Sequence, residues 1–590
     1  MGAQREERNK MTNSTKHRLL PPRSCWPLLP NSAALVTAGS GTKTVTTLLD
    51  CLKLLMQAHR YLARRRGGAG VALTCGPHKH VRERIMEHKN PAKRPTVVIE
   101  DSKWTRYFIE LQPLPCSHLP EVRIKDRRDE IVGKVRCIIQ DFIGNDKNLL
   151  RGMNTVDALE RLGLGYHFEK EIATFMDVLS SKPIGGDDLC IQELHERRWE
   201  FQAHIGSNVD ALLSLYEAAH LSKCNEDVLK KALVFTVDRL SSLANSGHLP
   251  KPILDKVLHA LASPTYRRTK WHQAKFYISI YEDDKERNQD ILELAKLNFH
   301  ILQQMHRDEV NNFSLWYKDL NPRRMLGEYI RERPVESYYW AIILYPEAHQ
   351  VKTRMMYAKI LVLVSFFDDI FDSYATMEEV HRFNQVVQSW DEEAAGQIGK
   401  CYTYMMSHIS ETLEFFMSDC GAPPVAIDCL KESLKEISKC MVKELVWREE
   451  RQAPTVHDYL TKAAAISVQY VPVVIICFAA MDAKAELYKW ANSFPKIIEI
   501  AAVMCRLMDD VAGHENEKEE RSKCFTAVDC YIKEHGGTVE QAKKALDGLI
   551  EEHWSRLNQE FLSNDTLPVP LLTILVDLVR SMDGYVACNT

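Results

Sequence analysis

Apolar residues recur at helical spacing along most of the chain from Trp104 onward. In residues 225–240, for example, apolar side chains stand at positions i, i+3, i+4 and i+7, which places them on one face of a helix. No segment shows the sustained apolar–polar alternation that is typical of strands, and no repeat of fixed period emerges. The pattern therefore predicts an all-α fold.

The longest apolar run, residues 471–481, is shorter than the ~20 residues that a membrane span requires. We expect a buried core helix there and no membrane partner. The net charge of −4 gives no reason to expect nucleic acid or an anionic membrane as a partner. The 16 cysteines are scattered singly, which suits free thiols in a reducing compartment better than a disulfide framework or a zinc site.

Two polar regions divide the chain. The first ninety residues are rich in Arg, Lys, Ser and Thr and poor in acids, with three arginines at residues 64–66. This composition fits an organelle transit peptide, a disordered leader, or coding sequence wrongly joined to the true start, and the three interpretations stay open. A charge run at residues 281–289, between helical segments, predicts a linker.

An acidic cluster ends the apolar run that starts at Ile360. Asp368 and Asp372 are four residues apart, so they share a helix face, while Asp369 points roughly 100° away. Carboxylates on a hydrophobic helix are unfavourable unless a cation meets them. Mg²⁺ takes one or two carboxylates together with substrate phosphates, although a solvated or salt-bridged helix end is the simpler alternative.

A second acidic cluster follows another mostly apolar segment, residues 497–508. Asp509, Gly513 and Glu517 fall at i, i+4 and i+8, on one stripe of a helix. Two acidic helix faces suggest opposed carboxylates across a pocket that can hold several metal ions. Metal ions in such a position can clamp a diphosphate and neutralise the charge that develops as it leaves.

These clusters resemble the metal motifs of the class I terpene synthases of plants. The first has the Asp-Asp-x-x-Asp form, and the second is similar to the family's Asn/Asp-Asp-x-x-Ser/Thr/Gly-x-x-x-Glu form. Arg331 and Arg333 resemble its Arg-x-Arg segment, which lies upstream of the first motif. Arg94-Pro95, followed after eight residues by Trp104, resembles its Arg-Arg/Pro-x8-Trp signature.

The resemblance runs from about residue 94 to residue 585 and implies a division of the chain. After a leader, residues 1–90, it implies an N-terminal α-barrel-like helical domain, residues 91–285, without an active site of its own. A C-terminal metal-binding catalytic bundle, residues 286–590, follows. No Asp-x-Asp-Asp motif is present, which argues against the protonation-driven cyclisation of some relatives.

The resemblance also implies three Mg²⁺ ions, for which Mn²⁺ can substitute. The implied ligand positions are Asp368 and Asp372 from the first motif and Asp509, Gly513 and Glu517 from the second. Gly513 stands where relatives usually have a Ser or Thr hydroxyl, so we expect water to fill that position. The acidic run after Glu517 is one residue longer than usual, so the register there needs a test. Asp369 and Asp510 would orient the ligands without touching the metal.

Three arginines would hold the departing diphosphate in this resemblance: Arg331, Arg333 and Arg506. A guanidinium group matches phosphate oxygens with two hydrogen bonds and keeps its charge. The alternative for each is an ordinary ion pair, and Arg506 can instead pair with Asp509, one turn further on.

Aromatic residues at two positions match those that line the carbocation pocket of relatives, Trp340 and Tyr585. Aromatic faces stabilise positive charge by about 0.5–2 kcal/mol each. The phenylalanines beside the first motif, Phe366, Phe367 and Phe371, are more typical of plain core. Pro472 lies in a segment that resembles the family's kinked helix, and proline gives a physical cause for a break.

The substrate follows from the Arg94-Pro95 pair, which resembles the sesquiterpene-forming branch of the family. We therefore expect farnesyl diphosphate, a C15 substrate, and conversion to a sesquiterpene hydrocarbon or alcohol plus diphosphate by a monomeric, cytoplasmic enzyme. A true transit peptide would instead favour geranyl diphosphate, a C10 substrate, in plastids.

Two other functions are kept as alternatives. A prenyl-chain-elongating transferase also uses aspartate-rich metal sites, but it would normally show two Asp-Asp-x-x-Asp motifs. Relatives continue beyond the position of Thr590 with residues that complete the last helix and help to close the active-site mouth. Without them we expect water to capture the cation early, and a truncated, inactive helical relative is the remaining alternative.

Overall fold

A computed structural model describes residues 103–110, 121–144, 149–181, 208–464, 466, 470–481, 483–520, 524–564 and 567–589, without some of their side chains, among them those of residues 515–520 and 583–589. Throughout these residues the regular elements are helices, with no strand among them, which confirms the predicted all-α fold. The predicted leader and the Arg94-Pro95 pair lie outside the described residues. Two compact units emerge, built mainly from Arg128–Leu297 and from Asn298–Val579.

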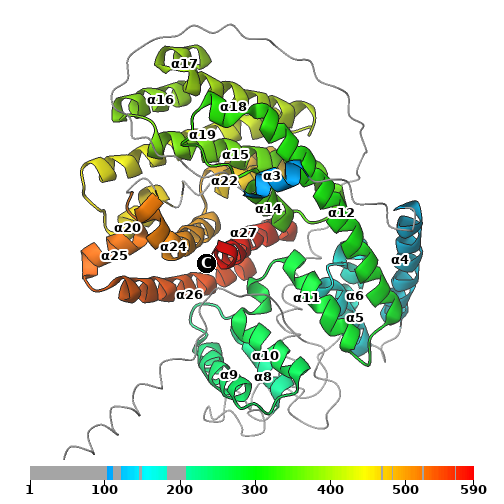
Figure 1. The fold of residues 1–590 in the computed structure, drawn as a ribbon. Helices are drawn as coiled ribbons and strands as arrows, with labels where there is room; N and C mark the ends of the chain where they lie inside the picture. The colour runs from blue at the N-terminus through cyan, green and yellow to red at the C-terminus, as the bar shows by residue number, and fades with distance from the viewer. Residues whose placement is uncertain are drawn as a thin grey trace, which may run out of the picture. The chain divides into compact units, whose positions relative to one another are not determined.

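The first unit contains helices packed around several small apolar clusters (Figure 1). In chain order its elements are α4 (Glu121–Gly144), α5 (Leu149–Arg161), η3 (Gly165–His167), α6 (Glu169–Ser181), α8 (Val209–Ala219), α9 (Asp227–Asn245), α10 (Lys251–Ala262), η5 (Thr265–Arg267) and α11 (Lys270–Asp283). In α9 the buried residues Leu229, Ala232, Thr236 and Leu240 recur every three or four positions. This spacing confirms the amphipathic helix predicted for residues 225–240.

The second unit contains longer helices and both acidic motifs. Its elements are α3 (Lys103–Ile109), most of α12 (Gln289–Leu320), α13 (Pro322–Met325), α14 (Pro334–Leu344), η6 (Ala348–Gln350), α15 (Val351–Ser373), α16 (Met377–Ser389), α17 (Glu392–Ile398), α18 (Lys400–Ser418), α19 (Pro424–Glu449), α20 (Val456–Tyr459), η7 (Leu460–Ala464), α22 (Tyr470–Ala480), α23 (Ala485–Asn492), α24 (Lys496–Glu520), α25 (Ala527–His535), α26 (Val539–Ser563) and most of α27 (Val569–Asn589). The element η7 is a π-helical turn.

Side-chain caps fix where several of these helices begin. Thr376 and Glu379 form a reciprocal capping box at the start of α16, and Thr526 and Asp529 form another at the start of α25. Each box satisfies backbone N–H groups that have no partner inside the helix. The cap of α25 matters for the site, because it fixes a helix start that contacts the second acidic motif.

The apolar run predicted as a core helix forms α22, which is buried around its whole circumference from Tyr470 to Phe478 apart from Val471. None of the helices that the structure describes is long and apolar enough to span a membrane. Pro472 is the third residue of α22 as the structure describes it. Residues 465 and 467–469, between η7 and α22, lie outside the described residues, so the break in this segment stays a prediction.

Helices α15 and α24 carry the two acidic motifs in the second unit. Helix α15 packs against α14, α18, α19 and α22, while α24 packs against α22, α25, α26 and η7 (Figure 1). Each of the two helices is therefore held by several others. Residues 284–288 connect α11 to α12, within the predicted linker, and the domain boundary at residue 285 stays a prediction.

Candidate functional site

Helix α15 presents the first acidic motif in its last two turns, with the three aspartates in different surroundings. The side chain of Asp368 is 37% exposed, whereas that of Asp369 is 3% exposed. The two neighbours therefore point in different directions, as their helical spacing predicts. Asp372 is partly buried one turn after Asp368, on the same face.

Arg331, in the connection before α14, joins the first two aspartates. Its backbone N–H donates to Asp369 Oδ2 at 2.8 Å and its Nε donates to Asp369 Oδ1. Its Nη2 donates to Asp368 Oδ2. Burial raises the pKa of Asp369 to about 6, against the opposing charge of Arg331. Arg331 therefore supplies the positive charge that this part of the motif requires.

Asp372 lies among further charges. Burial raises its pKa well above the usual range, and the nearby carboxylates of Asp368 and Glu444 add to the rise. Its Oδ1 accepts a hydrogen bond from Cys524 Sγ at 3.6 Å, and its backbone carbonyl accepts one from Arg448 Nη1 at 3.1 Å. The acids here repel one another in a weakly solvated place, where an additional cation would stabilise them.

Helix α24 presents the second motif. Burial raises the pKa of Asp509, and while Arg506 opposes that rise, the charge of Asp368 adds to it. Both motifs also contact α19, because Arg448 donates to the backbone carbonyl of Asp372 and Glu444 lies 3.7 Å from Arg506. Gly513 lies one turn further along α24 and is partly exposed. Glu517 is also on α24, as predicted, but its side chain lies outside the described residues.

Arg506 lies within a group of polar side chains from three elements. Its Nε is 3.0 Å from Asp510 Oδ1 and donates to the hydroxyl of Tyr459 at 2.9 Å. Its Nη2 is 3.7 Å from Glu444 Oε2, on α19. The guanidinium group thus pairs with Asp510, four residues further on, and not with Asp509, the partner that the sequence had suggested as an alternative.

Asp510 is 1% exposed and connects α24 to α25. Its Oδ2 accepts the backbone N–H of Ala527, the first residue of α25, at 2.7 Å. One turn later, His514 Nδ1 lies 2.9 Å from the Thr526 hydroxyl that caps α25. Asp510 therefore orients both Arg506 and the start of α25, in a place where it does not compete with Asp509.

The remaining predicted residues lie in less constrained surroundings. Arg333 is the N-cap residue of α14, with Nη1 3.8 Å from Glu336 Oε1 and a side chain that is 41% exposed. Trp340 is partly buried in the same helix. Tyr585 lies on α27, and its side chain is outside the described residues.

The phenylalanines beside the first motif are core residues. Phe366, Phe367 and Phe371 are each at most 3% exposed. The rings of Phe367 and Phe371 are stacked with centroids 5.6 Å apart, and Phe383 lies 5.1 Å from Phe367. These rings support the end of α15 from within the helical bundle.

Sequence reasoning missed Glu444, Arg448, Tyr459 and Cys524. Each touches a predicted site residue, yet none belongs to a motif. Glu444 and Arg448 are four residues apart on α19, so helical spacing places them on one face, but nothing in the sequence says what that face meets. The packing of α19 and α20 near α15 and α24 supplies that information.

The oxygen donors of the site fit a hard divalent cation. Aspartate carboxylates are the ligands that Mg²⁺ prefers, and because burial raises the pKa values of Asp372 and Asp509, a bound cation would stabilise the charged forms of both. Within the part of the chain that the structure describes, no three His, Cys, Asp or Glu residues already stand close enough to hold a metal ion. Asp368, in particular, is engaged by Arg331.

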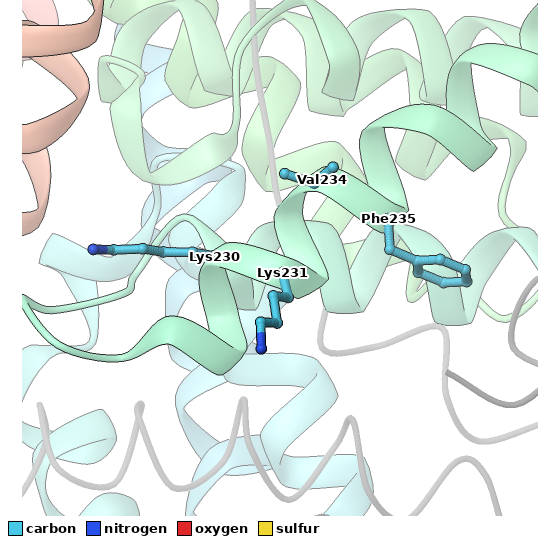
Figure 2. Close-up of a pocket in the computed structure, with 4 residues that line it drawn as sticks. All are labelled: Lys230, Lys231, Val234 and Phe235. Carbon is cyan, nitrogen blue, oxygen red and sulfur yellow. The ribbon is translucent and has the colours of Figure 1, made fainter. Parts of the chain in front are cut away.

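A surface hollow of about 420 Å³ occurs elsewhere, on α9 of the first unit (Figure 2). Lys230, Lys231, Val234 and Phe235 line it. Among the described residues that line it there is no acid that could bind a metal ion and none of the predicted site residues.

Two family models match this chain, and both describe domains of terpene synthases. Residues 318–556 match the metal binding domain of the terpene synthase family, and residues 187–261 match the terpene synthase N-terminal domain. Sesquiterpene synthase TPS2 of Cananga odorata is 30% identical over 527 residues, which cover 85% of this chain and 91% of the relative. Alpha-humulene synthase of Zingiber zerumbet is 30% identical over 517 residues, covering 82% and 92%.

Solved structures give the same result for the fold. Isoprene synthase from grey poplar leaves (Populus x canescens), in complex with three Mg²⁺ ions and dimethylallyl-S-thiolodiphosphate, superposes with a TM-score of 0.69 at 25% identity, covering 79% of this chain and 93% of that one. Limonene synthase with 2-fluorolinalyl diphosphate superposes with a TM-score of 0.75 at 22% identity, covering 84% and 95%.

Proposed function

Because the chain belongs to the terpene synthase family, we propose that it ionises farnesyl diphosphate with the help of Mg²⁺ and converts the carbocation to a sesquiterpene. Its relatives are lyases that act on prenyl diphosphates, and the chain is an enzyme of this kind. The product would be a hydrocarbon or an alcohol, released together with diphosphate. Several relatives are named sesquiterpene synthases or for a product of that class, which supports the C15 substrate.

The observation that carries the proposal is that two acidic helices, each with an arginine beside its acids, both contact α19. Arg331 pairs with Asp368 of α15, and Arg506 pairs with Asp510 of α24. From α19, Arg448 donates to the backbone carbonyl of Asp372 and Glu444 lies 3.7 Å from Arg506. A diphosphate carries several negative charges, so it requires cations on more than one side. Carboxylates that recruit metal ions, next to guanidinium groups that bind phosphate directly, meet that requirement.

Mg²⁺ would be held by Asp368 and Asp372 from one helix and by Asp509 and Glu517 from the other, with water at Gly513. Bound there, it would stabilise the negative charge that develops on the leaving diphosphate. The grey poplar isoprene synthase, a structural neighbour, contains three Mg²⁺ ions, which supports this number for the present chain. Mn²⁺ would serve as a substitute.

The protein's own groups would hold the substrate and protect the cation. Arg506 is oriented for binding by Asp510 and Tyr459, so its guanidinium does not have to be ordered when the diphosphate arrives. Arg333, at the start of α14, is exposed enough to reach the same diphosphate. Trp340 and Tyr585 would face the hydrocarbon part, where aromatic rings stabilise positive charge and exclude water.

The domain division and the cellular location follow from the same proposal. Residues 91–285 would form a domain without a catalytic site, and residues 286–590 would carry the reaction as a monomer. A C15 substrate fits a cytosolic enzyme. The second candidate is a plastid enzyme that uses geranyl diphosphate, which a true transit peptide in the basic first ninety residues would favour.

Release of inorganic diphosphate tests the reaction class directly. The full-length protein is incubated with farnesyl diphosphate, with Mg²⁺ or with EDTA, and free diphosphate is measured over time. We expect Mg²⁺-dependent release that falls by roughly two orders of magnitude or more in Asp372→Asn, because one metal ligand loses its charge. Release that is equally fast in EDTA, or in the variant, would contradict the proposal.

A further inference from the structure

Arg331 contacts Asp368 and Asp369 at the same time, and the two contacts differ in the number of hydrogen bonds and in burial. Asp369 holds Arg331 through two of its groups, the backbone N–H and Nε, and uses both carboxylate oxygens to do so. Asp368 holds it through one group, Nη2. Asp369 is 2% exposed, whereas the side chain of Asp368 is 37% exposed. The attachment to Asp369 is therefore double and buried, while the attachment to Asp368 is single and lies on the accessible side.

This arrangement affects the proposed metal site. Asp368 Oδ2 accepts a hydrogen bond from Arg331, so a metal ion bound to this oxygen would place its charge directly beside the guanidinium group, and the two cations would repel each other. Arg331 itself is only 15% exposed, so its charge and those of the two aspartates compensate one another with little help from water. In the absence of metal, Arg331 acts as the cation of the first motif.

We propose that the first divalent cation displaces Arg331 from Asp368, and that Asp369 then keeps Arg331 beside the motif with its Nη groups free for diphosphate. The inference rests on the proposed function as far as the metal at Asp368 is concerned. It assigns Asp369 as a positioning residue, since it acts through Arg331. It also assigns Arg331 two successive partners, a carboxylate before the metal binds and a phosphate afterwards.

The difference in attachment explains why one contact breaks and the other stays. A single, solvent-accessible hydrogen bond can be replaced by water and metal as it opens. A buried carboxylate that loses a guanidinium and a backbone N–H together would be left without partners, which is strongly unfavourable. The backbone contact also fixes the position of residue 331, so the side chain can turn without moving the start of α14.

The test measures metal binding in the absence of any substrate. Free Mn²⁺ is followed by electron paramagnetic resonance as it is titrated with full-length protein, and Arg331→Gln is compared with the wild type. Because the variant removes the competitor of the metal, we expect it to bind the first Mn²⁺ about tenfold more tightly. Unchanged or weaker binding in Arg331→Gln would overturn the proposal.

The matched control is Arg333→Gln, which removes the same charge two residues away. Arg333 lies 3.8 Å from Glu336 and contacts neither Asp368 nor Asp369 in the described hydrogen bonds and ion pairs. Its substitution should leave the affinity for Mn²⁺ within about twofold of the wild type. An equal increase in both variants would mean that only general charge matters, and would overturn the inference.

Arg331→Lys and Asp369→Asn separate displacement from loss of folding. A lysine keeps the positive charge but cannot hold both carboxylates, so we expect an affinity for Mn²⁺ between those of the wild type and Arg331→Gln.

Asp369→Asn keeps an acceptor for the backbone N–H but weakens the hydrogen bond to Nε of Arg331. In that variant inorganic diphosphate should increase the affinity for Mn²⁺ less than in the wild type, because Arg331 is less well placed to bind it. An equal increase would overturn the role of Asp369.

These outcomes are distinguishable from failure of the proposed function. If no prenyl diphosphate is turned over but Arg331→Gln binds Mn²⁺ more tightly, the displacement of Arg331 is supported and the substrate assignment is wrong. If turnover is normal but Arg331→Gln and the wild type bind Mn²⁺ equally, only the displacement of Arg331 is wrong. Absence of saturable Mn²⁺ binding in every protein would overturn both.

Discussion

Arg354 and Glu309 form a doubly hydrogen-bonded ion pair inside the second unit, with the side chain of Arg354 fully buried. Nε and Nη2 of Arg354 donate to the two carboxylate oxygens of Glu309 at 2.9 and 2.8 Å. The hydroxyl of Tyr338 donates to Glu309 Oε2 at 2.6 Å, and Arg354 Nη1 also donates to the carbonyl of Glu347 at 2.7 Å. The pair thereby ties α12 and α14 to α15, the helix that carries the first acidic motif.

Removal of one partner should destabilise the second unit strongly. In Arg354→Met the carboxylate of Glu309 remains buried without its cation, which typically costs about 3–5 kcal/mol. Urea unfolding followed by circular dichroism measures the change. The double variant Arg354→Met with Glu309→Leu is the control and should regain part of the loss, because it leaves no buried charge. A single variant as stable as the wild type would show that the pair contributes little.

Tyr459→Phe tests how Arg506 is oriented. The substitution removes the hydroxyl that accepts from Nε, while the ion pair with Asp510 remains. One such hydrogen bond contributes about 1 kcal/mol, so we expect KM for farnesyl diphosphate to rise by about fivefold, with a smaller change in kcat. Tyr488→Phe, at another buried tyrosine of the same unit, is the matched control and should leave KM unchanged. Equal KM values in both variants would argue against this role for Tyr459.

The register of the second motif is tested by its acidic run. Substitution of Glu517 by Ala should abolish most Mg²⁺-dependent turnover, since the helical spacing from Asp509 places it on the metal-facing stripe. Glu519 lies off that stripe, so Glu519→Ala should retain near-normal turnover. Glu520 returns to the stripe one turn beyond Glu517, and Glu520→Ala should also retain near-normal turnover, because Glu517 is the acid closer to Asp509. Steady-state kinetics at several Mg²⁺ concentrations make the comparison. The opposite pattern would place the ligand two or three residues further along α24.

Glu217 predicts a pH dependence of stability in the first unit. It is 6% exposed, and its Oε2 accepts the backbone N–H of Thr265 at 3.0 Å. Burial raises the pKa of Glu217 from 4.5 to about 7, although Arg268 and Arg161 oppose the rise. The folded unit therefore holds this proton more tightly than the unfolded chain does. Its stability should fall as the pH rises from about 4.5 to about 7, and this contribution should level off above that.

Thermal unfolding at pH 5 and pH 8 measures this effect. Glu217→Gln cannot ionise, so it should lose part of the decrease in melting temperature that the wild type shows between the two pH values. Glu282→Gln, at a half-exposed glutamate of α11, is the matched control and should behave like the wild type. If Glu217→Gln and the wild type shift equally with pH, this carboxyl group is not responsible.

The helices and the faces of their acids could be predicted from the sequence, because both depend on local spacing. The apolar runs predicted α15 and α24, and the step of roughly 100° per residue correctly separated Asp368 from its neighbour Asp369. The family was also identified from the order of the motifs. These features need only the periodicity of a helix and the chemistry of carboxylates.

The partners of the acids could not be predicted, because they come from distant parts of the chain. Arg331 reaches Asp368 across 37 residues, and Tyr459 reaches Arg506 across 47. Such contacts depend on how whole helices pack. The sequence also could not predict that Arg506 pairs with Asp510 instead of Asp509. Both acids lie about one turn from Arg506, within reach of its guanidinium group.

Product analysis by gas chromatography–mass spectrometry tests the central claim most directly. The full-length protein is given geranyl, farnesyl and geranylgeranyl diphosphate, each with Mg²⁺ and with EDTA. We expect a C15 hydrocarbon or alcohol from farnesyl diphosphate that requires Mg²⁺ and disappears in Asp368→Ala. A C10 product from geranyl diphosphate alone would contradict the substrate assignment, and no product from any of the three by folded protein would contradict the proposed function.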